Sequence, residues 1–109
     1  MDKKKYLNIL NELKKFRINL SKEIPIEKII LFGSYASGSV SKNSDIDLII
    51  VSKYFRKKRF RYRALGFYKY WNLDYPVDFL CYTPEEFNKL SKRITIVREA
   101  TKNGIKITG

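Results

Sequence analysis

The sequence predicts an α/β fold, because short apolar runs typical of strands are separated by longer segments typical of helices. The run from Lys28 to Phe32 is rich in isoleucine and ends at a glycine, as expected for a strand buried on both faces. A second strand is predicted for residues 45–52, which are dominated by isoleucine, leucine and valine. A third is predicted for 76–82, where proline is confined to the start.

Helical segments precede and follow these strands. Between Lys3 and Leu20, apolar side chains recur at steps of three and four residues, which indicates an amphipathic helix. Thr83 is a typical N-cap, since a proline occupies the first helical position and Glu86 follows three residues after the cap. Residues 94–102 are predicted to form a last helix, closed by an Asn-Gly pair, and a short final strand is expected after it.

Two segments between the strands have unusual composition. Residues 33–44 are rich in glycine and serine, which favours a loop or a loop that enters a short helix. Residues 53–71 lack any acidic side chain and interleave arginine and lysine with aromatic rings. We predict that most of this basic segment is a helix with rings packed inward and cations facing water. The alternative is a groove that binds nucleic acid.

Length and composition indicate one soluble domain, residues 1–109, in a reducing, cytoplasmic setting. The single cysteine, Cys81, cannot form an internal disulfide and is expected in the core, and no charged-then-apolar leader opens the chain. No apolar run approaches the roughly 20 residues that a membrane span needs, so no membrane partner is expected. A core of this size leaves a small net stability, which a bound ligand or an oligomer can increase.

The charge balance favours partners that carry phosphate. There are 23 Lys and Arg residues against 11 Asp and Glu, a formal net charge of +12. Such a charge attracts polyanions, although a soluble basic surface without a polyanionic partner explains it equally well. The chain has no histidine, which removes the usual zinc ligand and the usual neutral-pH base. Any metal is therefore expected to be a hard cation bound by oxygen.

Three aspartates carry the candidate chemistry. Asp45 and Asp47 stand two residues apart on a predicted strand and so project the same way, where a cation is needed to keep both ionised. Mg²⁺ or Mn²⁺ suits such carboxylates, with substrate phosphates completing its coordination. Asp78 joins them if its strand lies beside the second one. Three acids so arranged suit metal-assisted phosphoryl or nucleotidyl transfer, with Asp78 as candidate base.

The alternatives for these acids are structural. Asp45 and Asp47 could simply be solvated at the start of a strand, and Asp78 could form a salt bridge to one of the many arginines.

A glycine-serine pair precedes the acids. Gly33 and Ser34 follow the first predicted strand, where a glycine lets the backbone approach a ligand and amides entering a helix can face a phosphate. We expect the triphosphate of a nucleotide there, with the hydroxyl of Ser34 donating to a phosphate oxygen.

The segment Gly33-Ser34-Tyr35-Ala36-Ser37-Gly38, followed after six residues by Asp45-Ile46-Asp47-Leu48, resembles the signature of the DNA polymerase β-type nucleotidyltransferase superfamily, in particular its minimal nucleotidyltransferases. Ser44 stands before the first acid, and Asp78 matches the third acid of the family. The resemblance implies a small mixed sheet of three to four strands, with helices packed mainly on one face. One position departs from the pattern: many members carry an arginine where this chain has Ser37.

The resemblance implies an enzyme that transfers a nucleoside monophosphate from a nucleoside triphosphate, most simply ATP, to a hydroxyl on a protein or nucleic acid. It assigns catalysis and metal binding to Asp45, Asp47 and Asp78, and nucleotide binding to Gly33, Ser34 and Ser44. Minimal members often pair with a HEPN-domain protein, and some act as antitoxins that adenylylate this partner. Two alternatives stay open: a catalytically quiet antitoxin or regulatory subunit, and a basic module that binds nucleic acid.

Overall fold

The architecture is built on the pairing of β-strands. A computed structural model describes residues 3–38, 40 and 44–108. In this part of the chain four strands form one sheet in the order β3-β2-β1-β4. Their bounds are β1 Lys28–Phe32, β2 Ile46–Val51, β3 Val77–Tyr82 and β4 Ile105–Lys106. β1 is antiparallel to β2 and to β4, whereas β2 and β3 are parallel, so the sheet is mixed as the family resemblance implied.

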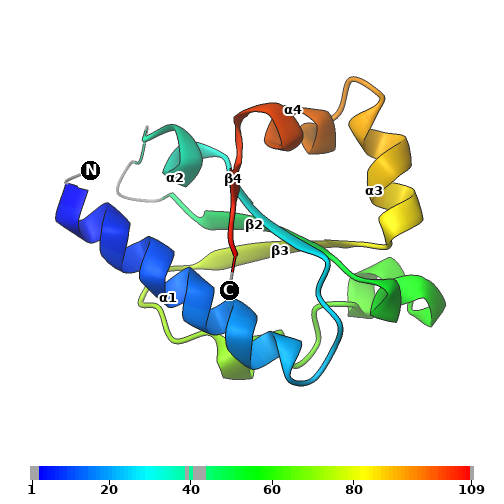
Figure 1. Cartoon of the computed structure of the whole chain (residues 1–109), viewed down its shortest axis with the longest axis horizontal. Helices are drawn as coiled ribbons and strands as arrows, with labels where there is room; N and C mark the ends of the chain where they lie inside the picture. The colour runs from blue at the N-terminus through cyan, green and yellow to red at the C-terminus, as the bar shows by residue number, and fades with distance from the viewer. Residues whose placement is uncertain (1–2, 39, 41–43, 109) are drawn as a thin grey trace.

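Helices cover both faces of this sheet (Figure 1). Their bounds are α1 Lys3–Ser21, α2 Ser34–Ser37, α3 Pro84–Ser91 and α4 Ile96–Asn103. The α/β prediction is confirmed, but the helices do not lie mainly on one face: α1 packs on one side, and α3 and α4 pack on the other. The reason lies in β2, where Leu48 and Ile50 face α1 while Ile49 and Val51 face α3 and α4. A strand that is apolar on both faces needs cover on both.

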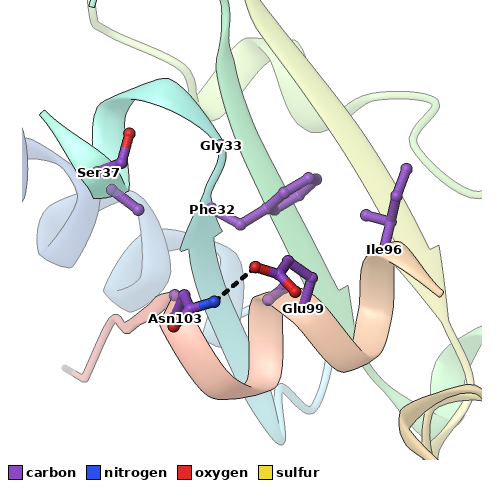
Figure 2. A pocket seen from close by; sticks show the side chains of 9 residues that line it. Phe32, Gly33, Ser37, Ile96, Glu99 and Asn103 are labelled. Atoms are coloured by element: carbon purple, nitrogen blue, oxygen red, sulfur yellow. Dashed lines mark hydrogen bonds between the residues drawn. The ribbon is translucent and has the colours of Figure 1, made fainter. Parts of the chain in front are cut away.

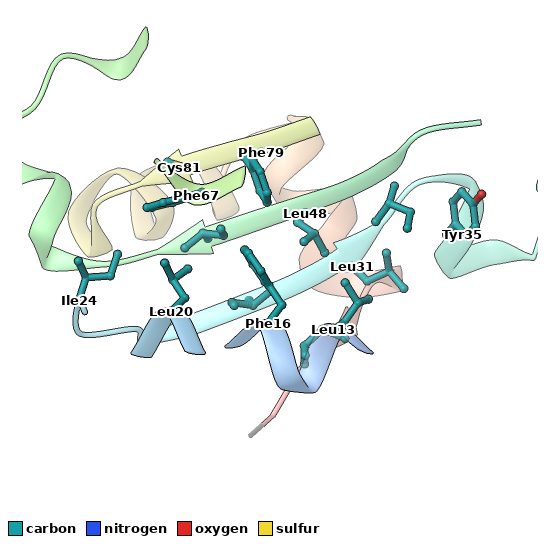
Figure 3. Packing of buried hydrophobic residues seen from close by; sticks show 14 of the residues in the cluster. Leu13, Phe16, Leu20, Ile24, Leu31, Tyr35, Leu48, Phe67, Phe79 and Cys81 are labelled. Atoms are coloured by element: carbon teal, nitrogen blue, oxygen red, sulfur yellow. The ribbon is translucent and has the colours of Figure 1, made fainter. Parts of the chain in front are cut away.

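The larger core lies between α1 and the sheet (Figure 3). Leu13, Phe16 and Leu20 of α1 are buried against it, at the three- and four-residue spacing that predicted the helix. Phe16 stacks on Phe79 of β3 with ring centroids 5.6 Å apart and meets Trp71 edge-on at 5.4 Å. These contacts fix the position of β3, which carries one of the predicted acids.

The basic segment is not the helix that we predicted. It forms three short 3-10 helices, Lys53–Lys57, Phe60–Tyr62 and Phe67–Tyr70, on the connection between β2 and β3. Gly66 adopts a φ of +86°, which ends a helical run, and the many cations have no acidic partners one turn away to support a longer one. Phe67 is buried, but Tyr62 and Tyr68 are exposed, so only some of the rings pack inward.

The start of α3 is as the sequence predicts. Thr83 accepts a hydrogen bond from the amide of Glu86, and the Glu86 carboxylate accepts one from the amide of Thr83, which completes a capping box. Within the described residues, no helix combines the length and the apolar character that crossing a bilayer requires.

Candidate active site

The parallel pairing of β2 and β3 places Asp47 directly beside Asp78. Both side chains belong to the sheet face that α3 and α4 cover, because Ile49 and Leu80, two residues further along each strand, pack on that face. Asp45 precedes β2 by one residue and is close enough to act electrostatically on Asp47. The predicted adjacency depended on the third strand lying next to the second, and this condition is met.

The charges of Asp45 and Asp78 both act on Asp47. Asp47 is half-buried, whereas Asp45 and Asp78 are exposed. Burial raises the pKa of Asp47 above its usual range, and the charges of Asp78 and Asp45 raise it further. Among residues 3–38, 40 and 44–108, no lysine or arginine forms an ion pair with any of the three. Within these residues, the salt-bridge alternative for Asp78 is therefore wrong.

Gly33 lies against this cluster. It joins β1 to α2 with φ +74° and ψ −151°, a conformation that side chains other than glycine rarely adopt. A Cβ atom at this position would lie 2.5 Å from the Oδ2 atom of Asp47. The turn therefore requires glycine for two reasons, its backbone conformation and the space that the carboxylate occupies.

The turn continues into α2, which begins at Ser34. The hydroxyl of Ser37 donates to the carbonyl of Ser34 at 3.3 Å, and Tyr35 is buried, with its ring 5.9 Å from that of Tyr75. Tyr35 thus anchors the turn in the core. Ser44 is half-buried immediately before Asp45, whereas residues 39 and 41–43, predicted as loop, lie outside the described residues.

A pocket of about 560 Å³ opens beside Gly33, between the end of β1, α2 and α4 (Figure 2). Its lining residues are Phe32, Gly33, Ala36, Ser37, Ile96, Glu99, Ala100, Asn103 and Gly104. Sequence reasoning missed its α4 side, although Glu99 and Asn103 stand four residues apart and therefore share one helix face.

The family follows from comparison with known proteins. A model of the nucleotidyltransferase domain matches residues 10–103, which include all the predicted site residues. The chain belongs to this family. Over 60 residues it is 42% identical to a Methanocaldococcus jannaschii protein named "Putative protein adenylyltransferase MJ1305". That match covers 54% of this chain and 40% of the relative, so the chain spans less than half of the relative's length.

A solved structure shares the fold of this nucleotidyltransferase domain. It is the crystal structure of a protein described as a putative nucleotidyltransferase from Sulfolobus solfataricus, which superimposes with a TM-score of 0.65 at 20% identity. The match covers 93% of this chain and 80% of that chain. The mixed sheet with its helices is therefore an arrangement already seen in a solved structure.

The acids of this nucleotidyltransferase domain suit a hard divalent cation in their chemistry. They offer carboxylate oxygens, and repulsion between them is relieved by a positive charge. Within the described residues, no three acidic, cysteine or histidine side chains are grouped closely enough to hold a metal ion by themselves. Mg²⁺ commonly takes one or two carboxylates together with substrate phosphates, so the donor set fits an ion that arrives with a nucleotide.

Cys81 has no role in this chemistry. It is 2% exposed on β3, and burial raises the pKa of its thiol to about 12 although the nearby Arg63 charge acts in the opposite direction. A thiol that stays protonated is a poor nucleophile, so Cys81 is a core residue, as predicted.

Proposed function

We propose that this chain transfers a nucleoside monophosphate from a nucleoside triphosphate to a hydroxyl acceptor, with pyrophosphate as the leaving group. The observation that carries the proposal is the pairing of Asp47 with Asp78 on adjacent strands, next to the turn at Gly33. Membership of the nucleotidyltransferase domain family supports the reaction class.

Each predicted residue has a role in this proposal. Asp45, Asp47 and Asp78 would hold Mg²⁺ or Mn²⁺ together with the substrate phosphates, and the bound ion neutralises phosphate charge and favours in-line displacement at phosphorus. The amides of Ser34 and Tyr35 lie in the first turn of α2, where a helix offers no carbonyl to accept from them, and they would donate to phosphate oxygens. Ser44 would contribute its hydroxyl to the same phosphates.

Proton transfer needs a base in a chain that has no histidine. Asp78 would accept the proton of the attacking hydroxyl, because its carboxylate is exposed and can be reached by an acceptor molecule.

We further propose ATP as the donor and a protein hydroxyl as the acceptor. The name of the Methanocaldococcus jannaschii relative, "Putative protein adenylyltransferase MJ1305", supports this choice. A HEPN-domain protein is the partner that the sequence signature suggests, with adenylylation of that partner as the antitoxin activity.

The experiment is a labelling reaction with the protein, Mg²⁺, α-labelled ATP and candidate acceptors. Wild type is expected to transfer label, and Asp45→Asn combined with Asp47→Asn to abolish transfer. Asp74→Asn is the matched control, because Asp74 is an exposed acid that lies before β3 and outside the cluster. Equal labelling by wild type and the double variant would refute the proposal. Partner neutralisation that survives loss of the three acids would instead favour a catalytically quiet antitoxin.

A second candidate function, binding of nucleic acid, is favoured by the basic segment. Four aromatic side chains of this segment are between 43% and 58% exposed and are interleaved with cations: Tyr54, Phe60, Tyr62 and Tyr68. Exposed rings beside cations suit stacking of single-stranded bases. Binding of a single-stranded RNA oligonucleotide should then weaken steeply as salt rises and should be independent of Mg²⁺. Absent or salt-insensitive binding would exclude it.

A further inference from the structure

We infer that the pocket between α2 and α4 binds the nucleoside half of the triphosphate, with Glu99 and Asn103 accepting hydrogen bonds from an amino group on the base. This inference rests on the proposed function and specifies where that site distinguishes one nucleotide from another. At about 560 Å³ the pocket lies within the range of 300 to 1,000 Å³ typical of small-molecule sites.

Continuity with the proposed phosphate site identifies the occupant. Gly33 and Ser37 line the pocket and also bound the turn at which the phosphates are proposed to bind. Phe32 of β1, which lines the pocket, is the register partner of Asp47 and lies directly opposite it on the same sheet face. A ligand whose phosphates lie at the turn can therefore extend directly into this pocket.

The charge on the pocket rim decides which half of the nucleotide lies there. The carboxylate of Glu99 would repel a phosphate but accepts hydrogen bonds from an uncharged donor. The side-chain amide of Asn103 donates to Glu99 Oε1 at 2.5 Å, which orients both groups (Figure 2). With this hydrogen bond formed, the Glu99 carboxylate and the side-chain carbonyl oxygen of Asn103 can both still accept hydrogen bonds from a ligand. The rim therefore suits N–H donors such as an exocyclic amino group.

The apolar wall suits a flat ring. Figure 2 shows the Phe32 side chain extending from β1 towards Ile96 of α4. Ile96 is 60% exposed and Ala100 is buried, so α4 presents an apolar strip beside the Phe32 ring. Aromatic side chains stack on bases irrespective of their identity, which leaves discrimination to the polar rim.

The test compares three ligands by calorimetry in the presence of Mg²⁺: ATP, purine riboside triphosphate, which lacks the amino group, and inorganic tripolyphosphate. Wild type is expected to bind ATP about tenfold more tightly than purine riboside triphosphate, about the size expected for one hydrogen bond to a charged group. It should bind tripolyphosphate more weakly still. Because this comparison needs no substitution, it does not depend on the folding of a variant.

Variants locate the effect. Glu99→Ala and Asn103→Ala should remove the preference for ATP, and Ile96→Ala should weaken ATP and purine riboside triphosphate alike, while tripolyphosphate binding should not weaken in any of the three. Ile94→Ala is the matched control, since Ile94 is 94% exposed and lies outside this pocket. Unchanged ATP affinity in the Glu99, Asn103 and Ile96 variants would overturn the inference, while the proposed function stands if Asp47→Asn still abolishes labelling. Absence of any nucleotide binding by wild type would overturn both.

Discussion

The Oδ2 atom of Asp47 occupies the space in which a side chain on Gly33 would begin, with only 2.5 Å between that oxygen and a Cβ atom built on the glycine. The turn between β1 and α2 and the acid on β2 are therefore fitted to each other. A change at either residue is expected to affect the other, and the glycine-serine turn and the acidic cluster behave as one unit.

Gly33→Ala is expected to lower the free energy of unfolding by about 3 kcal/mol, because alanine meets both an unfavourable φ and the Asp47 carboxylate. Gly66→Ala is the matched control. Its φ is +86°, but no atom lies within 4 Å of the added Cβ, so we expect a loss of about 1 to 2 kcal/mol. Urea denaturation measures both. Equal losses in the two variants would mean that contact with Asp47 contributes nothing.

Asp47→Asn is expected to raise the stability of the protein without nucleotide and to abolish transfer. Burial and the charges of Asp78 and Asp45 hold the pKa of Asp47 above its usual range, so the ionised carboxylate destabilises the folded state at neutral pH. Thermal unfolding at neutral pH tests this. Addition of Mg²⁺ with ATP should raise the Tm of wild type but not of Asp47→Asn. A lower Tm for the variant in the absence of ligand would contradict the argument.

Part of this site was predictable from sequence because Asp47 and Asp78 stand on strands and Ser34 begins a helix. The apolar runs identify β2 and β3, and the alternation of β2 fixes the face of Asp47, whereas Asp45 lies one residue before that strand. What sequence reasoning left conditional was the pairing of Asp78 with Asp47, because strand order depends on tertiary contacts. The α4 wall of the pocket could not be predicted for the same reason, since nothing local places Glu99 beside β1.

The basic segment shows where the reasoning failed. Its rings recur at spacings that suit a helix, but Phe55 and Phe67 must both reach the same core from a chain that is interrupted by Gly66. Short 3-10 helices bring both rings inward, so tertiary packing and the local break at Gly66 act in the same direction. The choice between helical cover and binding surface therefore could not be settled from composition.

Glu86→Ala is expected to destabilise the protein by about 2 kcal/mol, less than for a fully buried pair because the Glu86 side chain is 43% exposed. Arg63 is 7% exposed and donates to Glu86 and to the carbonyls of Lys58 and Cys81. Loss of the carboxylate would leave a buried cation without its partner. Glu85→Ala is the control, since the Arg56–Glu85 pair is exposed, and little change is expected.

The same pair predicts a dependence on acid. Burial opposes ionisation of Glu86, but hydrogen bonds from Arg63 and from the Thr83 amide outweigh it and hold the pKa below the usual 4.5. The stabilisation is therefore complete above pH 4.5 and is lost as the pH falls through the lower, folded-state pKa. The difference in free energy of unfolding between wild type and Glu86→Gln, measured by urea denaturation, should shrink as the pH is lowered below 4.5. A difference that is constant from neutral pH down through this range would contradict the assignment.

Cys81 is expected to resist alkylation in the native protein. Cys81 is 2% exposed, so the reagent cannot reach its sulfur. Burial also raises the pKa of the thiol to about 12, so the reactive thiolate does not form at neutral pH. Iodoacetamide should label it only after denaturation, as mass spectrometry would show. Rapid labelling of the native protein would indicate that β3 opens locally, which would also separate Asp78 from Asp47.

Ser37→Arg is expected to tighten binding of nucleoside triphosphate about tenfold, the effect of one added charge-assisted hydrogen bond. Ser37 lies at the end of α2, within four residues of Gly33, and lines the pocket next to the proposed phosphates. An arginine there would supply the cation that the family resemblance implies at this position. Calorimetry with ATP and with tripolyphosphate should show the same gain, because the new contact is to phosphate.

Added charge alone could also strengthen binding, so Ser91→Arg on α3 is the matched control for Ser37→Arg. Ser91→Arg adds the same charge at a half-buried serine outside the pocket. At physiological salt, screening should leave this charge with little effect on the affinity for a nucleotide bound at the pocket. Equal affinities for the two variants would show that net charge and not position is responsible. A gain for ATP without one for tripolyphosphate would place position 37 beside the nucleoside and away from the phosphates.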